Sequence, residues 1–484
     1  MHSKLILGGQ RDSGQGEPLD VFNPADGSTV GSFKAASAGQ VDIAFQCGGA
    51  ALAKGDWTGR PPHERAAVLF DSARLIEARA DQLAALQTAE NGKMLRESLG
   101  QAKSAAAIVR YFASACETLE GATPPPRGPY LSLTSHEPVG VVAAITPWNS
   151  PLTMAAQKIA PALAAGNAVI LKPSELTTLV SLELARCFVE AGLPQGLLSV
   201  LAGGREVGET IVSHRDLAMV SFTGGTQAGG AIAKAVAGRF VPTILELGGK
   251  SPNIVFADAD LAAAAKGVCS AIFGSGGQSC VSGSRLFVEQ DIYGTFLDRL
   301  VACADQLKVG SPLDDGSDIG PMASQTQRER IENYVAIARR DGGRIVLGGR
   351  RPDGPEYRQG AYYLPTIIDG LKHSSRVCQE EIFGSVLCVL PFATEEELIA
   401  LANDTVFGLA CGIWSSDYLK AWRVAGAIRA GTVWINTYKQ LSIAAPFGGY
   451  RQSGLGREKG LQGLRAYQQT KSIYLGGFGS SRKG

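Results

Sequence analysis

Apolar runs alternate with helical patterns from residue 139 onward, and this alternation restricts the fold of the chain more than any other feature. Four such runs, each followed by a helical pattern, lie at 139–145, 168–171, 198–201 and 218–222. Apolar strands that alternate with helices predict a parallel sheet whose two faces are both covered. A second series of the same kind extends from 254 to 436. We therefore predict an α/β fold with two doubly wound domains.

The patterns outside these two series are shorter. Residues 1–60 hold strand candidates, and helical patterns follow at 61–93 and 99–119. A proline-rich break precedes 130–134, whose alternating character predicts an exposed strand able to pair with another chain. A second strand candidate lies at 468–475. Because neither strand has an evident partner in the two α/β domains, we expect a homo-oligomer, either a dimer or a tetramer.

Composition excludes several classes of protein. The 46 basic and 45 acidic residues nearly cancel and form no basic patch, so we expect no nucleic-acid partner. No apolar run approaches the roughly 18 residues of a membrane span, and the N-terminal apolar segment is too short for a signal peptide, so we expect a cytoplasmic protein without membrane contact. The nine cysteines are scattered and include no CxxC pair, which argues against disulfides and structural zinc, and we predict no metal site.

One cysteine differs from the others in its surroundings. A helical pattern at 260–273 ends in a glycine cluster that carries Cys280. A thiol on a glycine-rich turn is open to a ligand and surrounded by backbone N–H groups, whereas most free cysteines are simply small buried apolar residues. Only five histidines are present, none at metal-ligand spacing with another, so a carboxylate is the favoured base for this thiol.

Polar residues follow the predicted strands, where ligands of parallel sheets bind. Residues 222–229 form a strand-to-helix turn that suits a pyrophosphate, although plain loop chemistry explains it equally well. Lys172 and Glu175 follow another strand, where a carboxylate can accept hydrogen bonds from a ribose diol and repel a 2′-phosphate; the alternative is a solvated pair. Two further glycine motifs, at 249–251 and 454–460, lack the spacing or context of nucleotide loops and are interpreted as turns.

Three more polar positions are suited to a catalytic or binding role. Glu246 lies between two leucines after an apolar strand, which favours a raised carboxyl pKa. Asn149 follows another strand, and its amide is suited to an oxyanion. The segment 380–384 pairs acidic and aromatic side chains that suit a ribose and a flat ring, although a surface turn with a core Phe has the same pattern.

Taken together, these motifs resemble the aldehyde dehydrogenase superfamily, of the NAD(P)-dependent, non-acylating type. The similarity extends from about residue 20 to 475, in order along the chain. The motifs that carry it are TPWNSP (146–151), KPSE (172–175), FTGGTQAG (222–229), LELGGKSP (245–252), GQSC (277–280), EEIFG (380–384) and PFGGYRQSGLGRE (446–458).

The resemblance implies a role for each matched residue. Cys280 would be the nucleophile, Glu246 the general base, and the Asn149 amide would form the oxyanion hole with the Cys280 N–H. Lys158 and Glu458 match positions that the family links to proton relay. The cofactor would be NAD, with NADP possible, and the cofactor-binding residues would be Thr146, Trp148, Lys172, Ser174, Glu175, Gly204, Gly208, Phe222, Gly224, Thr226, Gly229, Leu247, Glu381 and Phe383.

The resemblance also implies a domain organisation. An NAD-binding domain would comprise 1–119 and 139–247, a catalytic domain 248–445, and an oligomerisation flap 120–138 and 468–477. Residues 446–467 would return the chain to the NAD-binding domain.

The activity implied is oxidation of a small-molecule aldehyde to the free carboxylic acid through a thiohemiacetal and a thioester of Cys280. The sequence departs from many members of the family beside the chemistry, which leaves the substrate open; the positions are Ser150, Gln157, Ser279, Val281 and Ile443. A CoA-acylating semialdehyde dehydrogenase is the alternative enzyme, and Glu246 argues against it. An inactive NAD-binding or structural protein of the same fold and a thiol hydrolase are further alternatives.

Overall fold

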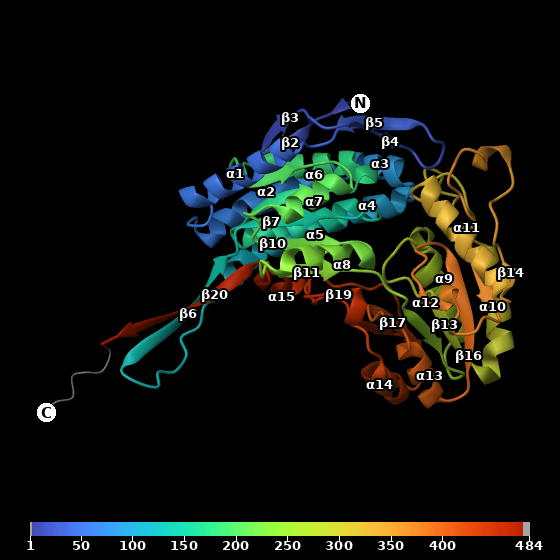
Figure 1. The fold of residues 1–484 in the computed structure, drawn as a ribbon. Coiled ribbons are helices and arrows are strands. Elements are labelled where there is room, and N and C mark those ends of the chain that lie inside the picture. The colour runs from blue at the N-terminus through green and yellow to red at the C-terminus, as the bar shows by residue number, and fades with distance from the viewer. Residues whose placement is uncertain (1, 478–484) are drawn as a thin grey trace.

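The computed structural model describes residues 2–477, which form two open α/β sheets and a projecting two-stranded ribbon (Figure 1). The first sheet has eight strands in the order β19-β11-β10-β7-β8-β9-β2-β3. Its strands are β2 (Leu5–Leu7), β3 (Gln10–Asp12), β7 (Val141–Ile145), β8 (Ala168–Lys172), β9 (Leu198–Val200), β10 (Met219–Thr223), β11 (Thr243–Glu246) and β19 (Gly454–Leu455). Strands β7 to β11 are parallel to one another, as the continuous apolar runs predict.

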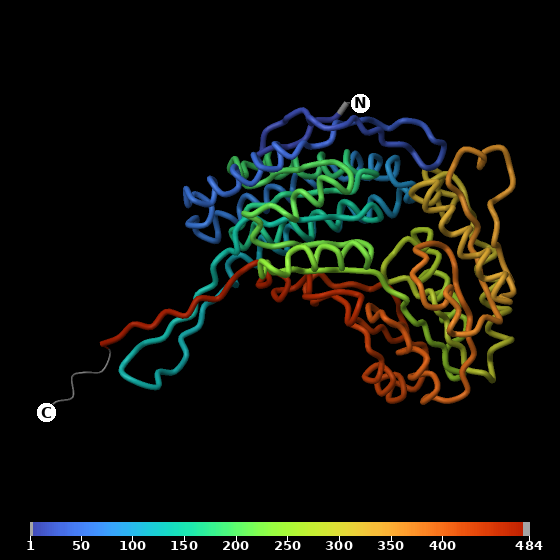
Figure 2. Tube along the Cα trace, viewed as in Figure 1, coloured from blue at the N-terminus to red at the C-terminus, as the bar shows by residue number. Residues whose placement is uncertain are grey.

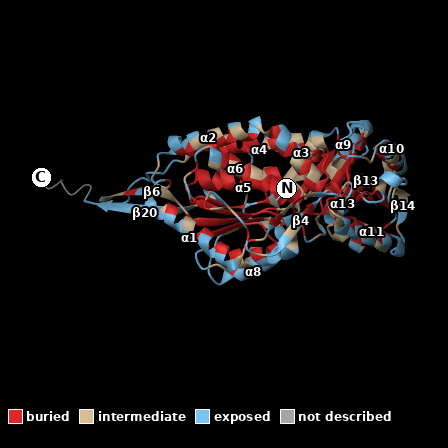
Figure 3. Ribbon diagram, turned by 90° about the horizontal axis from the view of Figure 1, so that it is seen from above, coloured by how far each residue is buried: buried red, intermediate tan, exposed pale blue. Residues whose placement is uncertain are grey.

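Helices cover both faces of this sheet, and its strands form a buried layer between them (Figure 3). Residues of β7 and β8 are all buried, which explains why their sequences do not alternate between apolar and polar. The helices are α1 (Ala38–Lys54), α2 (Pro62–Ala78), α3 (Ala80–Asn91), α4 (Leu95–Ala115), α5 (Pro151–Ala164), α6 (Thr178–Glu190), α7 (Arg205–Ser213) and α8 (Thr226–Ala237). A small outer sheet pairs β1 (His2–Ser3), β5 (Thr29–Lys34) and β4 (Pro18–Phe22).

The second sheet has seven strands in the order β14-β15-β16-β13-β12-β17-β18, and only the β14–β15 pair at its edge is antiparallel. The strands are β12 (Pro252–Val255), β13 (Arg285–Glu289), β14 (Arg344–Leu347), β15 (Thr366–Asp369), β16 (Val386–Phe392), β17 (Ala410–Trp414) and β18 (Thr432–Ile435). The helices are α9 (Leu261–Phe273), α10 (Tyr293–Asp305), α11 (Gln325–Arg340), α12 (Arg376–Gln379), α13 (Glu395–Asn403) and α14 (Tyr418–Ala427).

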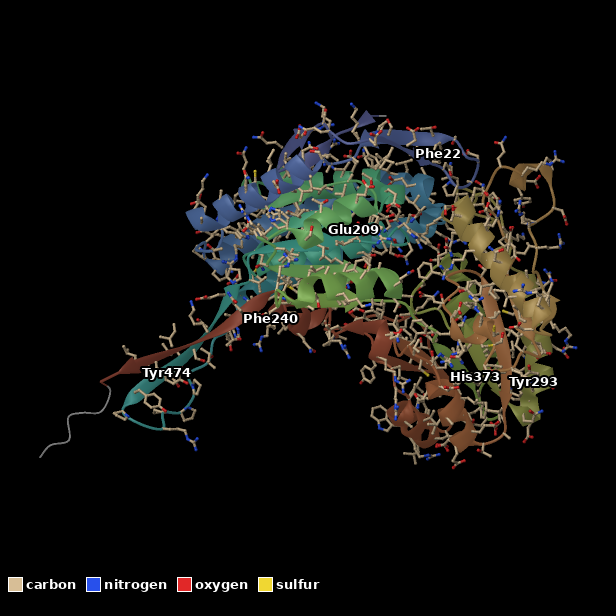
Figure 4. All side chains as sticks on the ribbon, viewed as in Figure 1. Phe22, Glu209, Phe240, Tyr293, His373 and Tyr474 are labelled. Carbon is tan, nitrogen blue, oxygen red and sulfur yellow. The ribbon has the colours of Figure 1, made fainter. Side chains whose placement is uncertain are left out.

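The ribbon pairs β6 (Tyr130–Pro138) with β20 (Gln468–Gly476) in an antiparallel register. It extends away from the rest of the molecule, and the labelled Tyr474 lies far out along it (Figure 4). The sequence predicted strands in both segments without an evident partner in the two α/β domains; in the structure the two strands pair with each other.

The return segment crosses back beneath the first sheet before it enters the ribbon (Figure 2). On this path β19 adds an antiparallel strand at the edge of the first sheet beside β11, and α15 (Gly460–Arg465) follows. The interpretation of 454–460 as a turn alone was therefore wrong. Gly454 has φ +154°, and a Cβ there would lie 2.3 Å from the Leu245 carbonyl oxygen, so the close pairing requires glycine.

The predicted fold class, two doubly wound α/β units with a small β ribbon, is confirmed. Four further local features of the structure differ from the prediction. Helix α1 was not predicted, and the pattern at 61–93 is two helices, because the chain turns at Arg79 (φ −105°, ψ 13°). Strand β15 and helix α12 were also missed. Among the described residues, no helix is both long and apolar enough to cross a membrane.

Candidate active site

Most of the predicted site residues lie at one edge of the first sheet. Strands β7, β8, β10 and β11 are parallel, so the residues that follow them emerge on the same side. Chain order reverses between β7 and β10, and such a switch point is where open α/β sheets bind their ligands. The predicted residues after these strands and β9 are Thr146, Trp148, Asn149, Ser174, Glu175, Gly204, Gly208, Gly224, Thr226, Gly229 and Leu247, while Lys172, Phe222 and Glu246 lie within the last residues of their strands.

The loop that carries Cys280 leaves helix α9 in an unusual backbone conformation. Ser275, Gly276 and Gly277 have φ values of +57°, +63° and +71°. A Cβ on Gly277 would lie 2.2 Å from the Gly384 carbonyl oxygen, so the turn requires glycine at that position. Cys280 follows and is partly exposed, whereas six of the other eight cysteines are buried. Cys280 thus lies on the predicted glycine-rich turn, as a residue that is less buried than most of the other cysteines.

Two contacts join the first sheet to this loop and its neighbours. The Asn149 side-chain amide donates to the Gln278 carbonyl, with N and O 2.9 Å apart. The Trp148 and Phe383 rings meet edge to face with centroids 5.3 Å apart, and Phe383 holds a positive φ of +64°. The two sheets thus bring their predicted residues together around the cysteine loop.

Glycines 248 and 249 let the backbone after β11 lie directly against Glu381 and the cysteine loop. A Cβ on Gly248 would lie 2.2 Å from Glu381 Oε2, and one on Gly249 would lie 2.7 Å from the Cys280 carbonyl oxygen. The Gly249 N–H donates to Glu381 Oε1 at 3.1 Å. Residues after β11 are thus in direct contact with the cysteine loop and with Glu381, which explains the glycine pair of the motif LELGGKSP.

Glu246 is buried, and its Oε1 has no hydrogen-bond partner. Burial and the neighbouring Glu458 raise the pKa of Glu246 well above its usual value, although Lys158, Arg457 and Lys459 oppose the shift. The sequence predicted this direction from the flanking leucines. A carboxyl group in this state gains or loses a proton near neutral pH more readily than an exposed one.

The Cys280 thiol is held mainly in its neutral form. Burial and the charges of Glu381 and Glu246 raise the pKa of Cys280 to about 12, against the opposing effects of the Val281 backbone and Lys459. Burial also raises the pKa of Glu381 to about 7, opposed by its hydrogen bond from Gly249. The thiol therefore needs a proton acceptor before it can act as a nucleophile.

Lys158 and Glu458 form a buried ion pair behind the site. Gln157 donates to the other oxygen of the same carboxylate. Lys158 Nζ also lies 3.1 Å from Ser221 Oγ, to which the Tyr467 hydroxyl donates at 2.9 Å. The network is polar, enclosed and electrostatically coupled to Glu246.

Three local features lie at or beside the predicted cofactor residues. Lys172 Nζ lies 3.8 Å from Glu175 Oε2; the lysine is buried and the carboxylate is half exposed, so the pair is not simply solvated. A Cβ on Gly229 would lie 2.4 Å from Leu247 Cδ2, which explains glycine in the first turn of α8. The buried hydroxyls of Thr146 and Thr223 have no partner in the described structure and remain available to a ligand.

Two residues near the thiol were not predicted, namely Lys439 and Lys459. Each interacts electrostatically with Cys280, and each has a positive φ. Lys459 directly follows the predicted Glu458, so its charge was visible in the sequence. Nothing in the sequence indicated that Lys439 would lie close to the cysteine loop.

Comparisons with known proteins agree with this arrangement. The sequence model of the Aldehyde dehydrogenase family matches residues 11–473. A betaine aldehyde dehydrogenase of Bacillus subtilis (strain 168) is 39% identical over 479 residues, covering 98% of this chain and 97% of that relative. A betaine aldehyde dehydrogenase of Mesorhizobium japonicum is 40% identical over 474 residues, with the same coverage.

Solved structures are similarly close. The betaine aldehyde dehydrogenase of Staphylococcus aureus in complex with NAD+ has a TM-score of 0.96 at 36% identity, covering 98% of this chain and 94% of that one. The indole-3-acetaldehyde dehydrogenase of P. syringae, in complex with NAD+ and IAA, has a TM-score of 0.96 at 39% identity, covering 98% and 96%. With its fold and nearly its whole length matched in this way, the chain belongs to the aldehyde dehydrogenase family.

Proposed function

We propose that the protein oxidises an aldehyde to the free carboxylic acid with NAD, and that Cys280 is the nucleophile. The observation that carries the proposal is the partly exposed thiol on its left-handed loop, beside a buried Glu246 whose pKa is raised. The family membership and the NAD+ complexes of similar structures support the reaction and its cofactor.

In the first half-reaction the Cys280 thiol gives its proton to a water molecule, and Sγ attacks the aldehyde carbon to give a thiohemiacetal. The Asn149 amide and the Cys280 N–H would donate hydrogen bonds to the oxyanion of this intermediate, where such donors act most strongly. NAD, held by the residues assigned below, would supply the acceptor for the hydride that leaves the same carbon. The product on the enzyme is a thioester of Cys280.

In the second half-reaction Glu246 takes a proton from a water molecule, which attacks the thioester carbon. The carbon–sulfur bond breaks, the acid leaves, and the Cys280 thiol is restored. The Lys158–Glu458 pair lies behind Glu246. The charge of Glu458 raises the pKa of Glu246 and that of Lys158 lowers it, and this coupling supports a role for the pair in moving the proton onward.

For the cofactor, we assign the adenosine ribose to Lys172 and Glu175 and the pyrophosphate to the N-terminus of α8 after Gly225. Trp148, Glu381 and Phe383 lie beside the cysteine loop and are assigned to the nicotinamide end. The first sheet would accordingly be the NAD-binding domain (1–119 and 139–247) and the second the catalytic domain (248–445), with 446–467 returning to the first.

We further propose that the protein is a cytoplasmic homo-oligomer assembled through the β6–β20 ribbon (120–138 and 468–477). Leu133, Ile473, Tyr474 and Leu475 are exposed apolar side chains on this ribbon. An exposed two-stranded sheet with apolar side chains is a suitable surface for a second copy of the chain.

The test of the function is NADH formation from an aldehyde, followed by identification of the product. We expect NADH and the free acid without added CoA. A requirement for CoA with an acyl-CoA product would instead show the acylating enzyme, and NAD binding without NADH formation from any aldehyde would show an inactive protein of this fold.

Replacing Asn149 by Ala should lower kcat by about two to three orders of magnitude, the usual effect of losing one oxyanion donor. Since this amide also donates to Gln278, the rate at which iodoacetamide alkylates Cys280 should be measured in parallel, to detect any disturbance of the loop. An effect confined to KM would mean that Asn149 only contacts the substrate.

Replacing Glu175 by Gln should weaken the preference for NAD over NADP. In the wild type, a 2′-phosphate would bring about two negative charges next to this carboxylate, so we expect NAD to be preferred by roughly ten- to a thousandfold in kcat/KM. The comparison is kcat/KM for both cofactors in both proteins. A wild type that prefers NADP, or a variant with no improvement for NADP, would contradict the repulsion.

A further inference from the structure

Lys439 places a cation against the loop that carries Cys280. Its Nζ donates to the Ser270 carbonyl at 3.2 Å and to the Gly274 carbonyl at 3.3 Å, at the end of α9. These two bonds leave one of the three ammonium protons for another acceptor. Burial and the nearby Lys93 lower the pKa of Lys439 to about 8, opposed by Glu97 and Cys280, so the amine is mostly protonated at neutral pH.

Lys459, on the return segment, places a second cation near the same thiol. Its Nζ lies 5.3 Å from the centroid of the Phe447 ring, and Phe447 belongs to the apolar cluster against which Cys280 packs. Burial lowers the pKa of Lys459, opposed by the charges of Glu458, Cys280 and Glu246. No hydrogen bond or ion pair of the Lys459 ammonium is formed within residues 2–477.

The carboxyl groups around the thiol either have hydrogen-bond or ion-pair partners of their own or favour their neutral form. Glu97 accepts from the Ser275 N–H and hydroxyl, and Glu458 is paired with Lys158. Burial raises the pKa of Glu246, as described above. Glu381 is bonded to the Gly249 N–H. Neither lysine therefore forms a direct ion pair with these carboxylates, although Glu97 acts on Lys439, and Glu458 and Glu246 act on Lys459, through their charges.

We infer that the aldehyde substrate carries a carboxylate, which Lys439 and Lys459 bind next to Cys280. The inference rests on the proposed function and narrows its substrate class to oxo acids. Two cations that lack carboxylate partners disfavour a cationic aldehyde and attract an anionic one. Gln101 of α4 donates to the hydroxyl of Ser150, the residue between Asn149 and α5, at 2.9 Å, which adds polar groups beside Asn149.

The test compares kcat/KM for three aldehydes of similar size: succinic semialdehyde (anionic), butanal (neutral) and betaine aldehyde (cationic). We expect succinic semialdehyde to exceed butanal by about tenfold or more, equivalent to one well-placed charge interaction, and betaine aldehyde to be the poorest substrate. Equal values for the anionic and neutral aldehydes, or a preference for betaine aldehyde, would overturn the inference.

Lys439→Met and Lys459→Met then identify the groups responsible. The measured quantity is the ratio of kcat/KM for succinic semialdehyde to that for butanal, because any general damage to the site affects both substrates. We expect each variant to lower this ratio by about tenfold, and Lys266→Met, at an exposed position of α9, to leave it unchanged. A ratio unaffected in both site variants would overturn the assignment of these lysines.

The outcome for butanal separates this inference from the function on which it rests. NADH from butanal with no preference for the anion would leave aldehyde oxidation standing and overturn only the substrate class. NADH from none of the three aldehydes would overturn the proposed function, and the inference with it.

Discussion

Replacing Cys280 by Ala is expected to reduce aldehyde oxidation to background, a loss on the order of a million-fold, since no thiohemiacetal can form. The fold should be unchanged because the side chain is small and partly exposed. Circular dichroism checks the fold, and quenching of tryptophan fluorescence by NAD checks cofactor binding.

Cys269→Ala and Cys303→Ala are the matched controls, because Cys269 lies on helix α9, which leads to this loop, and Cys303 lies on α10, which packs against α9. Both variants should retain activity. Substantial turnover in Cys280→Ala together with its loss in either control would remove Cys280 from the mechanism.

Replacing Glu246 by Gln is expected to produce a burst of NADH followed by turnover that is slower by about two to four orders of magnitude. The amide is close in shape to the acid but cannot accept the proton of water, so the thioester forms and then persists. Rapid-mixing measurements of NADH resolve the burst from the steady state. Steady-state turnover equal to that of the wild type would show that another group activates the water.

The pH dependence of the wild type provides an independent check on the same residue. A base works only when deprotonated, and the pKa of Glu246 is raised. Turnover limited by hydrolysis should therefore fall, as pH decreases, at a higher pH than the usual carboxyl pKa would allow. This acidic limb should be absent from the slow turnover of Glu246→Gln.

The parallel sheet could be predicted because its central strands are buried on both faces and therefore apolar throughout. Helix α1 was missed because Gly48 and Gly49 interrupt its periodicity, although the Ser37 and Gln40 capping box was present in the sequence. Strand β15 has only four residues and pairs with β16, a long-range contact that no local pattern reveals.

The site shows the same division. Cys280 and Asn149 follow regular elements and Glu246 ends one, next to glycines or apolar residues, so the sequence alone indicated where these three residues lie relative to the strands and helices. The edge-to-face contact of Trp148 with Phe383 joins residues from the two sheets and depends on the positive φ of Phe383. Lys439 reaches the cysteine loop by a similarly irregular backbone, and local sequence does not encode such long-range placements.

The buried Lys158–Glu458 pair joins helix α5 to the last part of the chain, across 300 residues. Strand β19, which completes the first sheet beside β11, also comes from this late segment. During synthesis, a nascent chain could fold its first strands and helices long before these partners leave the ribosome. Until then Lys158 would be a buried cation without its carboxylate, so the enzyme becomes competent only when nearly the whole polypeptide has been made.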